Sequence, residues 1–211
     1  FLPGEASGTP GLRTSMPLAR LIPQGACDEL TLLTGGACTV TVTAEAGDTA
    51  TAESYRVSEA GLHLFRFDTR DFPGAERVTV DAGECGAVNY SVIPAVRDGV
   101  RLAWRSSAGS VEHYTFPVVR TVTVRAERRE AEGPEGRVVA ASSAGRETLL
   151  ASAYEGQAVL EALACLTAAP EVWIAEGDVY TPVCVVTDEA VVRRHGTLCC
   201  LEIAVRPKRK S

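Results

Sequence analysis

The sequence has few aromatic residues, a single methionine and no long apolar run. Aromatic residues occupy only 6% of the 211 positions, so small and β-branched side chains must fill much of the core. Such residues favour strands over helices. Every apolar stretch is far shorter than the roughly 20 residues that cross a bilayer as a helix. The composition therefore predicts a mainly β protein with no membrane partner.

Positive charge is also too scarce to draw the chain to nucleic acid. The sequence holds 21 Lys and Arg against 27 Asp and Glu, which gives a formal net charge of −6. No global positive field attracts a polyanion to such a chain. The short stretch 208–211 is a basic tail, and a solvated chain end explains it as well as a phosphate contact does. We expect no nucleic-acid partner.

The motifs that usually mark an active site are missing. There is no G-x-S-x-G elbow, no D-x-D-x-D-G calcium loop, no C-x-x-C pair and no glycine-rich phosphate loop. His63, His113 and His195 fall in or beside expected strands or at a turn, without the spacing of metal ligands. The segment 106–110 is interpreted as a hairpin turn. The sequence thus predicts no catalytic residue, no metal site, no cofactor and no enzymatic activity.

Seven cysteines are an odd number, so they cannot all pair within the chain. They stand at positions 27, 38, 85, 165, 184, 199 and 200. Their distribution over expected strands and a helix is typical of small buried hydrophobic residues, which favours free thiols. One disulfide in the first half remains an alternative, joining Cys38 to Cys85 or Cys27 to either of them.

Strict alternation of polar and apolar residues from Thr39 to Thr43 is typical of a strand with one buried face. Turn residues such as Gly, Pro and Asp separate further candidates at similar spacing, which indicates an antiparallel sandwich. The other expected strands are 52–57, 62–67, 77–81, 88–93, 100–105, 112–116, 118–126, 137–141, 147–151, 171–175, 179–187, 190–194 and 198–205.

One helix is expected at 153–168. Ser152 and Glu155 have the S-x-x-E spacing of a capping box, in which each side chain satisfies a free N–H of the first turn. The apolar residues that follow at helical spacing on one face are Val159, Leu160, Leu163 and Leu166. Pro170 ends the helix.

These patterns divide the chain into an extended arm, two β-sandwich-like domains and the basic tail. The arm covers residues 1–20, an N-terminal Ig-like β-sandwich covers 21–117, and a C-terminal β-sandwich with one amphipathic helix covers 118–207. Trp104 is expected to anchor the core, and Trp173 to pack against the helix.

The charged run 127–136 contains nothing that could be buried cheaply, so it is expected to be a hairpin tip or a mobile loop. Together with the arm 1–20 it is long enough to reach a neighbouring subunit. The sequence therefore suggests that function lies in edges and appendages and not in a pocket. Simple surface disorder is the alternative for both segments.

The C-terminal half resembles a group of structural proteins. Arg101-Leu-Ala-Trp104, then Gly109, then Glu112-His-Tyr-Thr-Phe116 is similar to a hairpin of prophage and bacteriophage tail or minor virion proteins. Ala169-Pro-Glu-Val-Trp-Ile174, Tyr180-Thr-Pro-Val183 and a closing amphipathic strand, all following the expected helix, are similar to the same sandwich-plus-helix tail modules. The likeness spans about 100–207 and departs at Arg105-Ser106-Ser107, where that group usually has an Asn.

The resemblance implies a non-enzymatic tail or virion component, assembled in a host cytoplasm and acting through protein–protein contacts. Its partners would be other virion or tail proteins or copies of itself, as a homo-oligomer. A secreted or surface-anchored bacterial β-sandwich module that binds glycan or protein is the alternative.

Overall fold

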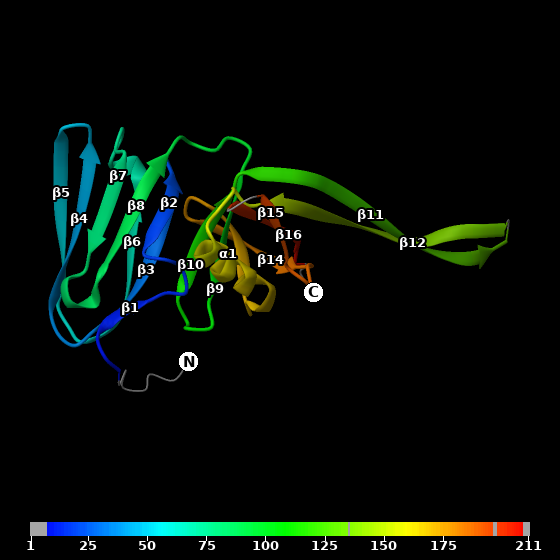
Figure 1. Cartoon of the computed structure of the whole chain (residues 1–211). Helices are drawn as coiled ribbons and strands as arrows, with labels where there is room; N and C mark the ends of the chain where they lie inside the picture. Colours follow the sequence, from blue (N-terminus) through cyan, green and yellow to red (C-terminus); the bar gives the residue numbers. More distant parts are fainter. Residues whose placement is uncertain (1–7, 135, 196–197, 209–211) are drawn as a thin grey trace.

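The computed structural model describes residues 8–134, 136–195 and 198–208, and it confirms a mainly β chain with a single helix. Strands make up 63% of it. They form three sheets, which we divide between an N-terminal unit (8–93) and a C-terminal unit (100–208) (Figure 1). Two long strands, β11 (Val118–Gly133) and β12 (Gly136–Ala151), leave the C-terminal unit as a projecting hairpin.

The N-terminal unit consists of two sheets around one apolar core. The five-stranded sheet has the order β2-β8-β7-β4-β5, and the three-stranded sheet has the order β1-β3-β6. Buried side chains of both sheets fill the space between them, for example Leu32 of β3 and Val80 of β7. The strands are β1 (Gly11–Arg13), β2 (Ala19–Pro23), β3 (Cys27–Thr34), β4 (Cys38–Ala46), β5 (Thr49–Val57), β6 (Gly61–Asp68), β7 (Arg77–Asp81) and β8 (Ala87–Ile93).

The alternation of polar and apolar residues that predicts β4 gives a strand with one buried face and one outer face. Val40 and Val42 are fully buried in the core, while Thr41 between them shares a hydrogen bond with Ser54 of β5 on the outer face. β7 contributes Val78 and Val80 to the same core in register with β4. A strand with one buried face was therefore correctly identified.

Residues 8–20 are not the extended arm that the sequence predicts. They include β1 and the start of β2, and Met16 between these strands is buried in the core of the C-terminal unit. The backbone N–H of Ser15 donates to Glu112 Oε1 at 2.8 Å. The segment packs on both units, because its strands pair in the N-terminal unit while Met16 and Ser15 contact the C-terminal unit. Residues 1–7 lie outside the described residues.

Two further features of the N-terminal unit differ from the prediction. β3 is buried along its whole length. The sequence does not predict it as a strand, because neither of its faces meets solvent and no alternation of polar and apolar residues results. β2 pairs with β8 in parallel, whereas the sequence predicts only antiparallel pairs. A parallel pair needs a connection over the sheet face, and the intervening strands supply it.

The C-terminal unit is one eight-stranded sheet with the helix on one face. The order is β10-β9-β13-β14-β16-β12-β11, and β15 also pairs with β16. Helix α1 (Gln157–Ala164) and the 3₁₀ turn Cys165–Ala168 cover the core side of the sheet, so the helix replaces one sheet of a sandwich. The remaining strands are β9 (Val100–Arg105), β10 (Val111–Phe116), β13 (Val172–Glu176), β14 (Val179–Val185), β15 (Val191–His195) and β16 (Leu198–Pro207).

The two tryptophans have different environments. Trp104 of β9 is fully buried in the C-terminal core, as expected. Trp173 does not pack against the helix. Its neighbours Val172 and Ile174 belong to the core, so alternation along β13 turns Trp173 to the opposite face, where its ring meets Tyr180 edge-on at 6.4 Å.

The prediction of a capping box at the start of the helix is wrong. The helix begins at Gln157 with Gly156 as its N-cap, without a side-chain cap. Ser152 Oγ instead accepts a hydrogen bond from the Leu201 N–H at 2.9 Å, and the Glu155 backbone forms a bridge with Cys199. Both residues tie the chain to β16, and this tertiary pairing outcompetes the local cap.

The domain boundary predicted at residue 117 separates strands that belong together. β9 and β10 pair with each other, and β9 also pairs with β13, so 100–116 is part of the C-terminal sheet. The connection between the units is the segment 94–99. It ends at Gly99, where a Cβ would lie 2.6 Å from Val96 Cγ1 and 2.9 Å from the Phe116 carbonyl. Only glycine lets the connection lie this close to β10.

All seven cysteines are free thiols in the structure. The disulfide considered for Cys38 and Cys85, or for Cys27, is not formed. Cys27 and Cys85 are buried, which is consistent with small hydrophobic side chains.

Replacing Tyr114 with phenylalanine is expected to lower the free energy of unfolding by about 1–3 kcal/mol. Its hydroxyl donates to Glu155 Oε1 at 2.8 Å and accepts from the Ala153 N–H at 3.1 Å. Burial and the Glu155 carboxylate both raise the pKa of Tyr114, so the hydroxyl stays a donor. Urea unfolding at pH 7 measures the loss. Tyr55→Phe on the exposed face of β5 is the control, and an equal loss there would contradict this role.

Candidate functional site: a projecting hairpin and the cleft at its root

The most unusual part of the molecule is the length of the β11–β12 hairpin beyond the sheet. β12 pairs with β16 only from Thr148 to Ala151. Among the described residues, no other strand pairs with the ribbon from Thr123 to Gly133 on β11 and 136–147 on β12. At about 3.3 Å per residue, these eleven residues of β11 extend about 35 Å from the sheet. Figure 1 shows this ribbon pointing away from both units.

Almost nothing covers this ribbon within one chain. All residues from Arg120 to Glu132 are exposed, and all residues of 136–144 are exposed as well. An isolated two-stranded ribbon is only marginally stable in water. Exposed valines lie along it, with Val124 at 66% and Val139 at 55% exposure. The ribbon thus presents apolar side chains and an unpaired strand edge to solvent.

Charge changes sign along the hairpin. The root strands, 118–125 and 144–151, carry Arg120, Arg125 and Arg146 against one glutamate. The distal stretch 130–137 carries three glutamates against one arginine, a net charge of −2. Mixed charge on an exposed edge discourages indiscriminate strand pairing. The separation of charge also gives the two ends of the hairpin different preferences for a partner.

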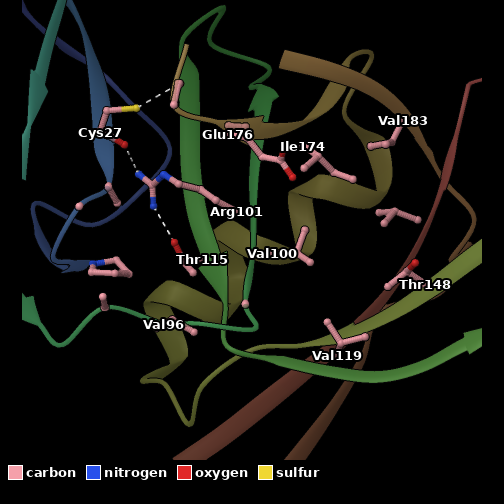
Figure 2. A pocket seen from close by; sticks show the side chains of 18 of the residues that line it. Cys27, Val96, Val100, Arg101, Thr115, Val119, Thr148, Ile174, Glu176 and Val183 are labelled. Atoms are coloured by element: carbon pink, nitrogen blue, oxygen red, sulfur yellow. Dashed lines mark hydrogen bonds between the residues drawn. The ribbon is translucent and has the colours of Figure 1, made fainter. Parts of the chain in front are cut away.

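An open apolar cleft of about 510 Å³ lies at the root of the hairpin. The connection 94–99, the turn between β2 and β3, the turn between β13 and β14, and the ends of β14 and β16 line it together with the hairpin root. Figure 2 shows Val96, Val100, Val119 and Val183 around this space. Val183 is a member of the C-terminal core, and Val100 and Val119 pack against that core.

The cleft is therefore the end of the core that the helix leaves uncovered. One row of neighbouring residues shows this: Val122 of β11 is opposite Thr148 of β12, which is opposite Val205 of β16. Val205 is 2% exposed, Thr148 is half-buried and Val122 is 45% exposed. The apolar face of the sheet thus runs out of the core and onto the hairpin.

Charged groups stand at the border of this apolar floor. Arg146 and Arg206 line the cleft, and Glu176 lies across from them. Arg101 is held in place at the inner side, since its guanidinium donates to the Thr115 hydroxyl at 2.9 Å and to the Cys27 carbonyl. Arg101 is paired with the buried Asp28, so Arg146 and Arg206 against Glu176 leave the border a small net positive charge. The cleft suits an apolar segment with acidic flanks.

A buried polar cluster joins the two units on the inner side of this cleft. Asp28 of β3 lies 3.1 Å from His113 Nδ1, 3.5 Å from an Arg20 nitrogen and 3.6 Å from an Arg101 nitrogen. Burial alone would raise the pKa of Asp28, but the contact with His113 and the charges of Arg20 and Arg101 together hold it well below its usual value. Asp28 is a buried anion whose compensating charges come from both units.

Three further contacts complete the cluster. His113 Nε2 lies 3.1 Å from the Tyr180 hydroxyl, which donates to Glu29 Oε1 at 3.0 Å. Burial and the Glu29 charge raise the pKa of Tyr180. Arg20 also lies 3.6 Å from the Glu112 carboxylate. The side chains of Arg20, Asp28 and His113 are at most 3% exposed, so the cluster acts as a clamp between the units. The same three residues help to line a smaller pocket of about 200 Å³.

No pattern in the sequence predicts that the residues of this cluster lie close together. The sequence predicts His113 on a strand, which is where it lies. Its partner Asp28, and Glu29, which accepts from Tyr180, lie on β3, a strand that the sequence does not predict. His63 contacts the Glu59 carbonyl and belongs to a different part of the molecule. The turn 106–110 joins β9 to β10 as expected, with Gly109 at φ +83°. Within the described ranges, His, Cys, Asp and Glu side chains form no group of three that could hold a metal ion.

In the described part of the chain, no helix has the length and apolarity needed to cross a membrane. A scan against protein-family models and a search of curated proteins both return no match to this chain.

Proposed function

We propose that this protein is a non-enzymatic assembly component that joins other protein subunits through the β11–β12 hairpin. The observation that carries the proposal is the ribbon Thr123–Gly133 and 136–147, which projects from the sheet with its valines and strand edge uncovered. A ribbon of this length gains its missing contacts on a neighbour. A tail or virion component of a phage, as the resemblance implies, is the biological setting that we favour.

The clamp between the units supports this function. A protein that transmits contacts through an assembly needs its two units in a fixed relation, and buried charge pairs set such a relation specifically. Asp28 and Glu29 on one unit, with His113 and Tyr180 on the other, provide it here. The surface that remains available for binding is then the hairpin and the cleft at its root.

Removing the ribbon is expected to abolish assembly and leave the fold intact. Val122 and Thr148 face each other across the hairpin, so an Asn-Gly turn can join them in place of 123–147. The deleted residues are almost all exposed, so the midpoint of thermal unfolding should change by only a few degrees. Light scattering over a wide concentration range should show mass growth for the parent and a monomer for the truncated chain.

The matched control changes the other two-residue turn of similar exposure, Gly47-Asp48 between β4 and β5, to Asn-Gly. This variant should assemble as the parent does. The proposal fails if the truncated chain assembles like the parent, or if the parent stays monomeric at every concentration and electron microscopy finds no ordered particles.

A further inference from the structure

We infer that the cleft at the hairpin root of one copy receives the distal hairpin of a second copy of this chain. This inference rests on the proposed function and names the partner of the hairpin. Two surfaces need a partner: the distal ribbon, which has apolar and acidic side chains, and the cleft, which has an apolar floor and a basic border. Both surfaces are apolar, and their charges are of opposite sign.

The apolar parts of the two surfaces correspond. Val138 and Val139 near the hairpin end are 50% and 55% exposed, and register places them opposite Ala131 and Glu130 on β11. Val138 and Val139 are consecutive residues of β12, so alternation turns them to opposite faces and the hairpin end is apolar on both sides. The cleft offers an uncovered core edge in Val100, Val119 and neighbouring valines, with about 510 Å³ of space.

The charged parts correspond as well. The distal stretch 130–137 has a net charge of −2, with Glu130 and Glu132 exposed. The cleft border carries Arg146 and Arg206. A second hollow at the hairpin root is lined by Arg125 and Lys208 but also by Glu127 and Glu147, so it adds no net charge. Opposite charge at matching surfaces steers encounter and fixes the register of docking.

A chain cannot fill its own cleft. The cleft lies at the root of the hairpin, and the extended ribbon carries its acidic end about 35 Å away from it. The contact is therefore between copies, and it joins two different surfaces. Such a head-to-tail contact generates a ring if the rotation closes and a filament if it does not.

Charge reversal on each side tests the contact. One variant carries Glu130→Arg with Glu132→Arg, and the other carries Arg146→Glu with Arg206→Glu. Either variant alone should associate at least tenfold more weakly than the parent by light scattering. A 1:1 mixture should recover the parental association, because each reversed surface then meets an opposite one. Arg56→Glu with Arg77→Glu, on exposed strands of the N-terminal unit, is the control and should have no effect.

The outcomes separate this inference from the proposed function. If the truncated hairpin abolishes assembly but the cleft reversal leaves it unchanged, or if the mixture fails to recover, the cleft is not the receptor and the assembly role stands. If the parent stops at a closed dimer, antiparallel pairing of two β11 edges is the contact and the inference is wrong. If removal of the ribbon has no effect, the proposed function itself is wrong.

Discussion

Replacing Asp28 with asparagine is expected to lower the free energy of unfolding by about 3–5 kcal/mol at neutral pH. The carboxylate is buried and lies within 3.6 Å of His113, Arg20 and Arg101. Asparagine keeps the size of the side chain but removes the counter-charge of Arg101 and one of the two carboxylates beside Arg20. Urea unfolding monitored by circular dichroism measures the loss. Asp48→Asn, on the exposed turn between β4 and β5, should change stability by less than about 0.5 kcal/mol.

Asp28 should also account for part of the loss of stability at low pH. The pKa of Asp28 in the folded protein lies below its ordinary value of 3.8, so the folded state binds this proton less readily than the unfolded state. Its contribution to stability is therefore complete above that ordinary value and is lost as the pH falls below it. Stability measured from pH 5 down to pH 2.5 should fall less steeply in Asp28→Asn than in the parent. Parallel curves would show that Asp28 is not the group responsible.

Replacing Trp104 with alanine is expected to cost about 3–5 kcal/mol, because it leaves a cavity at the centre of the C-terminal core. Trp104 is fully buried there and packs among residues of the sheet and of helix α1. Thermal unfolding of the variant should shift by many degrees, or the chain should fail to accumulate as a folded protein.

Trp173→Ala is the matched control for this prediction. Trp173 lies on β13, one strand away from Trp104, but on the half-buried opposite face. Its loss should cost less than half as much in the same measurement. Equal losses would mean that the C-terminal sheet does not have the single core face that the structure assigns to it.

Strands with one buried face could be predicted from the sequence because their pattern is local. β4 shows this most clearly, since Val40 and Val42 alternate with threonines. β3 could not be predicted in this way. Leu30 and Leu32 face the sandwich core, while Glu29 on its other face meets Tyr180 of the C-terminal unit, so polar and apolar residues are buried alike. Nothing local distinguishes a buried glutamate with a distant partner from an exposed one.

The helix and the hairpin show a second limit of local patterns. Ser152 and Glu155 have the spacing of a cap, but a partner on β16 some 45 residues later takes their hydrogen bonds. The charged run 127–136 correctly suggested an exposed hairpin tip. Its extension into two sixteen-residue strands was not expected, because alternation is absent where neither face is buried.

The separation of hairpin and cleft on one chain gives any assembly built from it a direction. At one terminus of a growing filament the last subunit has an empty cleft, and at the other the last hairpin is unfilled. A chain in which an Asn-Gly turn joins Val124 to Arg146, in place of 125–145, keeps Arg146 at its cleft and can accept a hairpin, but it has no distal hairpin to donate. Small amounts of this truncated chain, mixed with the parent, should therefore act as a chain terminator and shorten the assemblies in proportion to its share.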